Sequence, residues 1–244
     1  MGNLLRMSFV ATVHLVQLSP AASIRALRSV PSPQQVAGLR WADVGAGAHF
    51  GRGVLPPPAP GRVALLALWE DDTAIDRFFA GEHPVAETFL PGWSVRLEPL
   101  RQTGTIAGMP PLVDEEQPVD DAEPVAVLTY GHTKYRTLKP FLRANQGATV
   151  DALDSPALLA ATGLTRPPRM VGTFSLWRTA AEMKDYAYRR GGGHSGAMLD
   201  HARIGFHQEA LFARFRPYAS AGAWEGRDPL ASVAAAGAVE EPAA

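Results

Sequence analysis

The feature that most constrains the fold is an internal repeat. Residues 63–79, VALLALWEDDTAIDRFF, align without a gap with residues 171–187, VGTFSLWRTAAEMKDYA. Each run predicts an apolar strand that ends in Leu-Trp, a short polar turn, and a helix with apolar residues three positions apart. A Leu-Trp pair alone would be a weak match. The same apolar phase continues through the turn and into the helix, so the repeat indicates that the chain contains two copies of one structural unit.

The segments around the repeat predict the same order of elements in each half. Each half opens with a strand-like run and then a helix-like run, and the first helix has Ser19 as N-cap and Pro20 at its first position. Each half therefore reads β-α-β-β-α-β, the ferredoxin-like arrangement, in which two helices cover one face of a four-stranded antiparallel sheet. The remaining predicted strands are 8–18, 38–44 and 93–100 in the first half and 124–130, 158–164 and 211–218 in the second.

A proline-rich acidic stretch, AGMPPLVDEEQPVDDAEP, separates the halves and reads as a solvated linker. We expect an α+β protein with an N-terminal ferredoxin-like unit at 7–106, a linker at 107–123, a C-terminal ferredoxin-like unit at 124–230 and a disordered tail at 231–244. Two such units in tandem can pack sheet against sheet as in the dimeric α+β barrels. A pocket would then lie between the sheets.

The composition excludes several kinds of chemistry. The 244 residues include no cysteine, which removes disulfides, cysteine-ligated zinc, iron–sulfur clusters and thiolate-ligated haem. The 23 basic and 24 acidic residues give no positive field that would attract nucleic acid. The apolar stretch 7–18 is too short to span a bilayer and contains His14 and Gln17. We therefore expect a cytoplasmic protein without a transmembrane segment.

An unusual local pattern follows the second repeat, where three glycines at 191–193 precede His194. His194, Met198 and His201 lie at i, i+4 and i+7, so they would share one helix face. On a typical helix such a face packs against a sheet, with histidines that cap or bridge. The spacing matches no zinc motif, whereas one axial histidine to haem needs no second ligand. The P-loop, Rossmann, GxSxG and HExxH motifs are absent from the sequence.

The C-terminal half resembles the spheroidene monooxygenase family over residues 124–230. The resemblance rests on RPPRMVGTFSLWRTAAEMKDYAY (166–188), on a histidine soon afterwards, and on FHQEALFARFRPYASAGAWEG (206–226). VLTYGHTKYRTLKPFL (127–142) also resembles the opening strand and helix of the family. The elements that match the family pattern are Thr173 to Trp177, Met183, Tyr186, His194, Leu211 to Phe215, Gly222 and Trp224.

This resemblance implies a haem b enzyme that oxygenates an apolar small molecule with an electron donor or peroxide. It implies that His194 ligates the iron, with His201 as the main competitor. Two departures bear on the chemistry, because His207 replaces a serine of the pattern and Tyr130 stands where we expect an arginine. Under this hypothesis Met198, Phe174 and Trp177 would bind the cofactor, although Trp177 also suits ordinary core packing, and the catalytic candidates are Arg214, His207 and Arg136.

Two alternatives stay open at the level of sequence. The first is a haem-dependent dehydratase or peroxidase-like enzyme, since aldoxime dehydratases and dye-decolourising peroxidases are more distantly similar. A distal histidine would favour acid–base work on an oxime, and a distal arginine would favour cleavage of peroxide. The second is a barrel that binds a ligand without catalysis. A homodimer is possible but not required, because two fused units can close their own barrel.

Overall fold

The fold was obtained as a computed structural model, which describes residues 9–189, 192, 205–231 and 233. The first half contains β1 (Val10–Gln17), α1 (Pro20–Arg28), β2 (Leu39–Ala48), β3 (Pro58–Trp69), α2 (Asp72–Ala80), α3 (Pro84–Phe89) and β4 (Trp93–Thr105). The second half contains β5 (Val125–Thr133), the 3₁₀ turn η1 (Tyr135–Thr137), α4 (Leu138–Leu153), β6 (Leu158–Arg166), β7 (Met170–Trp177), α5 (Ala180–Tyr188) and β8 (His207–Ala221).

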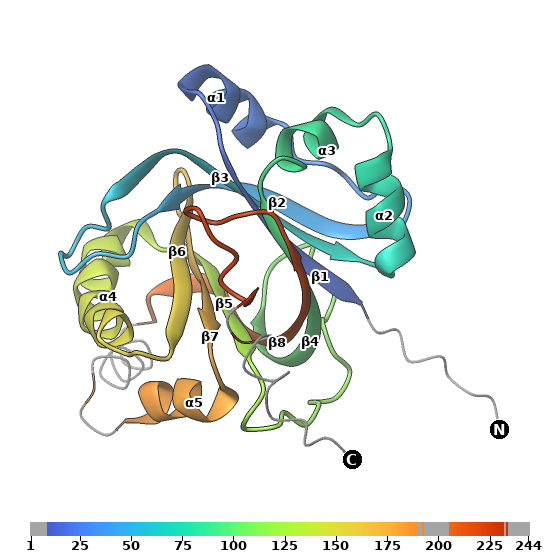
Figure 1. Cartoon of the computed structure of the whole chain (residues 1–244). Coiled ribbons are helices and arrows are strands. Elements are labelled where there is room, and N and C mark those ends of the chain that lie inside the picture. The colour runs from blue at the N-terminus through green and yellow to red at the C-terminus, as the bar shows by residue number, and fades with distance from the viewer. Residues whose placement is uncertain (1–8, 190–191, 193–204, 232, 234–244) are drawn as a thin grey trace, which may run out of the picture.

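The strands form one closed antiparallel barrel in the order β1-β3-β2-β6-β7-β5-β8-β4, with β4 pairing back to β1. The predicted α+β class with a barrel is confirmed. The strands of each half are neighbours, and the halves meet at β2–β6 and at β4–β8. Figure 1 shows α1, α2 and α3 on one side of this barrel and α4 and α5 on another. No helix in the described part of the chain is long and apolar enough to cross a membrane.

The strand pairing repeats from one half to the other. Val10 lies opposite Trp69 in the first half, and Val125 lies opposite Trp177 in the second. The neighbouring ladders carry an irregularity at the same place, between Leu39 and Trp41 against β3 and between Leu158 and Ala160 against β7. The sequence repeat therefore defines equivalent positions in three dimensions, 108 residues apart within the two repeat segments.

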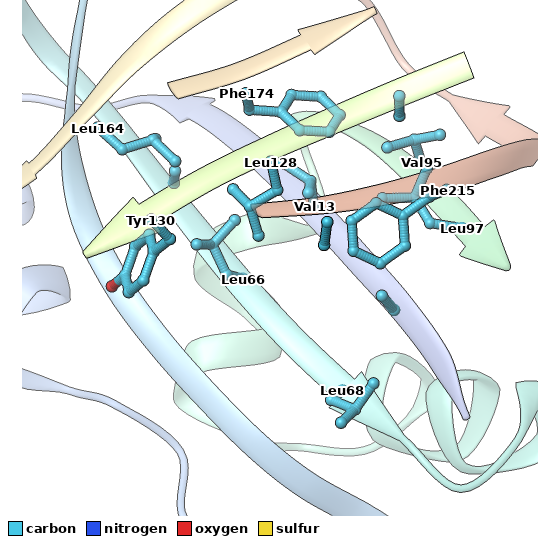
Figure 2. Close-up of a cluster of buried hydrophobic side chains, with 14 of the residues drawn as sticks. Val13, Leu66, Leu68, Val95, Leu97, Leu128, Tyr130, Leu164, Phe174 and Phe215 are labelled. Atoms are coloured by element: carbon cyan, nitrogen blue, oxygen red, sulfur yellow. The ribbon is translucent and has the colours of Figure 1, made fainter. Parts of the chain in front are cut away.

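The barrel interior is the main hydrophobic core. Figure 2 shows side chains from both halves that meet there, among them Val13, Leu66, Leu128, Phe174 and Phe215. Each of these is at most 6% exposed. The space between the two sheets, where we expected a pocket, is thus occupied by packed side chains. A ligand site has to be sought on the outward faces of the strands.

The acidic linker is more closely packed than its composition suggests. Leu112 is 3% exposed and joins the barrel core. Three of the acidic residues at or beside the linker pair with basic side chains on the barrel and on α5, namely Glu116 with Arg101, Asp121 with Lys184 and Glu123 with Arg216. The three carboxylates remain 41–67% exposed, so the segment is largely solvated, and the pairing of its charges and the buried side chain of Leu112 hold it against the barrel.

Candidate functional site

The outward face of the second half carries small side chains in its middle rows. Inward residues of this half belong to the barrel core, so alternation along each strand turns Thr129, Thr173 and Phe212 outward. Thr173 lies opposite both Gly163 and Thr129, and Thr129 lies opposite Phe212. One row therefore runs across β6, β7, β5 and β8, and Thr103 of β4 continues it.

At two positions of the equivalent row the first half carries large buried groups, whereas the half-buried Ser94 stands where the second half has Phe212. His14 lies opposite Leu65 in the first half, as Thr129 lies opposite Thr173 in the second. Thr173 aligns with Leu65 in the repeat, so Thr129 corresponds to His14. His14 is 5% exposed, Leu65 is fully buried, and the His14 ring stacks on Phe79 of α2 with centroids 4.4 Å apart. In the second half both threonines are only half-buried.

Two further replacements widen the difference between the halves. Gly131 stands at the position of Val16, and Ala187 of α5 stands at the position of Phe79. Four positions that the first half fills with His, Leu, Val and Phe thus hold Thr, Thr, Gly and Ala in the second. We call the outward surface around Thr129, Gly131, Thr173 and Phe212 the hollow face.

His207 lies at one end of the hollow face. A β-carbon added at Gly131 would come within 3.0 Å of His207 Cδ2, so the absent side chain makes room for the imidazole. The ring of Phe141 on α4 packs edge-on against His207 with centroids 5.0 Å apart. Beside them an open hollow of about 300 Å³ is lined by Thr103, Gly104, Ala210, Phe212 and residues 207–209. Of the predicted catalytic residues, His207 thus reaches this surface.

Arg214 also points outward, two residues along β8 from Phe212, and lies opposite Val127. Its Nη2 donates a hydrogen bond of 2.9 Å to the hydroxyl of Tyr188 at the end of α5. Its guanidinium carbon is 5.9 Å from the centre of the Tyr188 ring. His207 and Arg214 therefore flank the hollow face on one strand.

The predicted cofactor contacts Phe174 and Trp177 are not brought together. Phe174 is fully buried inside the barrel, whereas Trp177 faces outward beneath α5. Trp177 stacks on Tyr186 with centroids 4.7 Å apart, and its Nε1 donates to Ser175 Oγ. Burial raises the pKa of the Tyr186 hydroxyl, which donates to the Ala148 carbonyl of α4. Trp177 thus anchors α5 and α4 to the sheet, and Phe174 is a core residue.

The remaining predicted residues are Arg136, His194, Met198 and His201. Arg136 is exposed in η1, which begins two residues after the end of β5. His194, Met198 and His201 lie outside the described residues. The last described residue before them, Gly192, lies beside α4, where an added β-carbon would be 3.1 Å from Asp151 Oδ2. No group of three or more metal-binding side chains occurs in the part of the chain that the structure describes.

Tyr130, where we expected an arginine, belongs to a polar cluster inside one end of the barrel. Its hydroxyl donates to one carboxylate oxygen of Asp43, and Arg166 pairs with the other. Burial and the Asp43 charge raise the pKa of the Tyr130 hydroxyl. The Trp41 ring meets Tyr130 edge-on at 6.0 Å. This cluster joins the two halves near the short β2–β6 seam, and no local pattern indicates it because its members are far apart in the chain.

The relatives of this chain in sequence indicate its family. No family model matches the chain. It is 32% identical over 198 residues to the spheroidene monooxygenase of Rhodobacter capsulatus, which covers 76% of this chain and 79% of that protein. The chain belongs to the spheroidene monooxygenase family. The resemblance seen in residues 124–230 is confirmed, and the match extends well into the N-terminal half.

A second relative is the spheroidene monooxygenase of Cereibacter sphaeroides, with 27% identity over 207 residues and 83% of this chain covered. The chain spans 63% of the length of that relative. Among solved structures, an aldoxime dehydratase in complex with butyraldoxime superimposes with a TM-score of 0.53 and 10% identity, over 87% of this chain and 80% of that one. At this identity the likeness shows a shared fold.

The hollow face itself was missed at the sequence level, although a signal for it existed. Thr129, Gly131 and Ala187 carry no motif and differ from their neighbours only in size. Alignment of the two repeats places them opposite His14, Val16 and Phe79. A loss of bulk at several equivalent positions on one face is therefore a usable sign of a site in a duplicated chain.

Proposed function

We propose that this chain is a haem-dependent monooxygenase that acts on an apolar small molecule, with haem b bound at the hollow face. Membership of the spheroidene monooxygenase family supports the reaction class. The observation that carries the location is the loss of bulk at Thr129, Gly131 and Thr173, where the first half is packed solid.

We also infer that each half is a ferredoxin-like unit and that the chain is a tandem duplication. In spatial order the first half reads fourth, first, third and second strand, and the second half reads the same. Both halves have the helices expected between their strands, and the first has the additional α3. The shared register and the shared irregularity next to the Leu-Trp strands support a common origin of the two units.

The residues of the hollow face suit a flat, largely apolar group. Four neighbouring strands span about 14 Å at the usual strand separation. Over this width, glycine, threonine and alanine side chains allow close approach to the backbone. Phe212, Val127 and Phe141 supply apolar contacts that exclude water. A bound haem would supply an iron centre with one open position for activating dioxygen or peroxide.

Two histidines would then have different roles, one as iron ligand and one in proton transfer. We propose His194 as the ligand that holds the iron, with His201 as the alternative. Gly192, two residues before His194, lies against α4, and α4 contributes Phe141 to the edge of the hollow face. His207, which packs against Phe141 at this edge, carries an imidazole that can accept or donate a proton. Met198 and Arg136 stay predictions without a structural argument.

Reconstitution tests this proposal. Purified protein titrated with haem should develop a Soret band at about 400 nm, on the order of what a histidine-ligated haem shows. His194→Ala should abolish the band, and loss of the band only in His201→Ala would reassign the ligand. No titratable binding would refute haem dependence.

A second set of variants tests the location. Thr173→Leu restores the bulk of Leu65 and should weaken haem binding at least tenfold without loss of fold. The matched control is Ser94→Leu, which introduces the same side chain at a half-buried outward position of the first half. Equal effects of the two variants would place the haem elsewhere. For the loaded enzyme, labelled dioxygen with an electron donor should give a product that carries one labelled oxygen atom.

A further inference from the structure

Arg214 has a counterpart in the first half. Leu97 lies opposite Ala11, and Phe215 lies opposite the equivalent Ala126, so Arg96 and Arg214 hold equivalent outward positions on β4 and β8. Each arginine reaches toward the helix that follows the Leu-Trp strand of its own half. The surroundings of the two side chains can therefore be compared between the two halves.

Their charge environments differ sharply. Arg96 pairs with Asp72 at 2.6 Å and also with Asp76, both on α2. The equivalent positions on α5 are Ala180 and Lys184. The second copy has thus lost both carboxylates that neutralise the arginine and has gained a basic residue in place of one of them.

Three other basic side chains, on β4, α5 and β8, have acidic partners. Arg101 lies directly opposite Arg214 on β4, and like charges across a strand pair repel each other. Arg101, Lys184 and Arg216 are each compensated, by Glu116 at 2.9 Å, by Asp121 at 2.5 Å, and by Glu98 at 2.6 Å with Glu123 at 2.8 Å. Within the described residues, Arg214 forms no ion pair and bonds only to the Tyr188 hydroxyl.

We propose that Arg214 is the receptor for a carboxylate group carried by the ligand of the hollow face, an inference that rests on the proposed function for the location of that ligand. The Tyr188 ring and hydroxyl hold the guanidinium beside the end of α5. A guanidinium offers paired donors that match a carboxylate. The carboxylate comes either from the propionate side chains of haem or from a free carboxylate-bearing small molecule.

The test compares haem with haem dimethyl ester, in which both propionates are uncharged. Affinities of the full chain for both are measured by absorption titration for the unaltered protein, Arg214→Gln and Arg101→Gln. We expect Arg214→Gln to weaken binding of haem about tenfold, the lower end for a hydrogen bond to a charged group. It should leave binding of the ester unchanged. Arg101→Gln removes a neighbouring, already paired charge and should change neither affinity.

A second arm uses the haem-free protein and hexanoate. If haem and its ester bind alike but hexanoate raises the melting temperature of the unaltered protein and not of Arg214→Gln, the receptor serves a free carboxylate. Equal weakening of haem and ester by Arg214→Gln, with no hexanoate effect, would assign Arg214 to packing and overturn the proposal. If no haem binds at all, haem dependence fails, and the hexanoate arm still decides whether Arg214 binds anions.

Discussion

A buried histidine in the first half should make this protein sensitive to acid. His14 is 5% exposed, and its ring lies between β1 and the Phe79 ring of α2. Its Nε2 has no hydrogen-bond partner among the described residues. Burial, with a smaller contribution from the nearby Arg96 charge, lowers the pKa of the imidazole from 6.5 to about 3. Folding therefore holds His14 neutral at pH values where the unfolded chain would protonate it.

The sign and size of the effect follow from this difference. The unfolded chain binds the extra proton below pH 6.5, so the stabilisation is complete above that value and is lost as the pH falls toward 3. Each pH unit in this window is equivalent to about 1.4 kcal/mol. At pH 5 the loss attributable to His14 is about 2 kcal/mol, and its limit at low pH is about 5 kcal/mol. The total stability of a domain is about 5–15 kcal/mol, so this one side chain matters.

Urea unfolding at pH 7.5 and pH 5 measures the effect. His14→Leu replaces the imidazole by an apolar group without a titrating atom, so its free energy of unfolding should fall about 2 kcal/mol less between the two pH values than that of the unaltered protein. His49→Leu, at a histidine whose side chain is 46% exposed, is the matched control and should keep the original pH dependence. The reasoning is refuted if His14→Leu and the unaltered protein lose the same free energy on acidification.

Three further variants test other parts of the structure. Tyr130→Phe removes the hydrogen bond to the buried Asp43 and should lower the free energy of unfolding by about 1–2 kcal/mol in urea titrations; no change would mean that the cluster is dispensable. Gly131→Val should cost at least about 1–3 kcal/mol, because its β-carbon would lie 2.7 Å from the Glu209 carbonyl oxygen, and circular dichroism melting would show this. Ala187→Phe restores the aromatic ring of the first copy and should block haem binding in an absorption titration while the melting temperature stays within a few degrees.

Much of the fold could be predicted because local signals agree with it. Ser19 accepts a hydrogen bond from the Ala22 amide, as expected of an N-cap, and Pro20 opens α1. α4 runs from Leu138 to Leu153 although Pro140 is its third residue. The reason is that a proline in the first turn of a helix loses an N–H that has no partner within the helix.

The candidate site was harder to predict because it depends on which face a residue occupies. Phe174 and Trp177 are three residues apart on one strand, so they must point to opposite sides of the sheet, and the expectation that both contact the cofactor overlooked this. Arg214 and His207 reach the same surface, but that required the β5–β8 register, which a sequence does not display. The sequence of one half alone does not show that the inner faces of both halves pack together as the barrel core.

The pattern of divergence between the copies separates the scaffold from the site. Outside the polar cluster around Asp43, equivalent inward positions such as Val13 and Leu128 or Leu66 and Phe174 are apolar and buried in both halves. The losses of bulk are at outward positions of the second half and at the helix above them. A barrel whose inner face is shared must keep both copies compatible, since each side chain there packs against the other half. The outward faces do not have that constraint. In the first half this face is packed, with His14 under Phe79. In the second half it carries smaller side chains between His207 and Arg214.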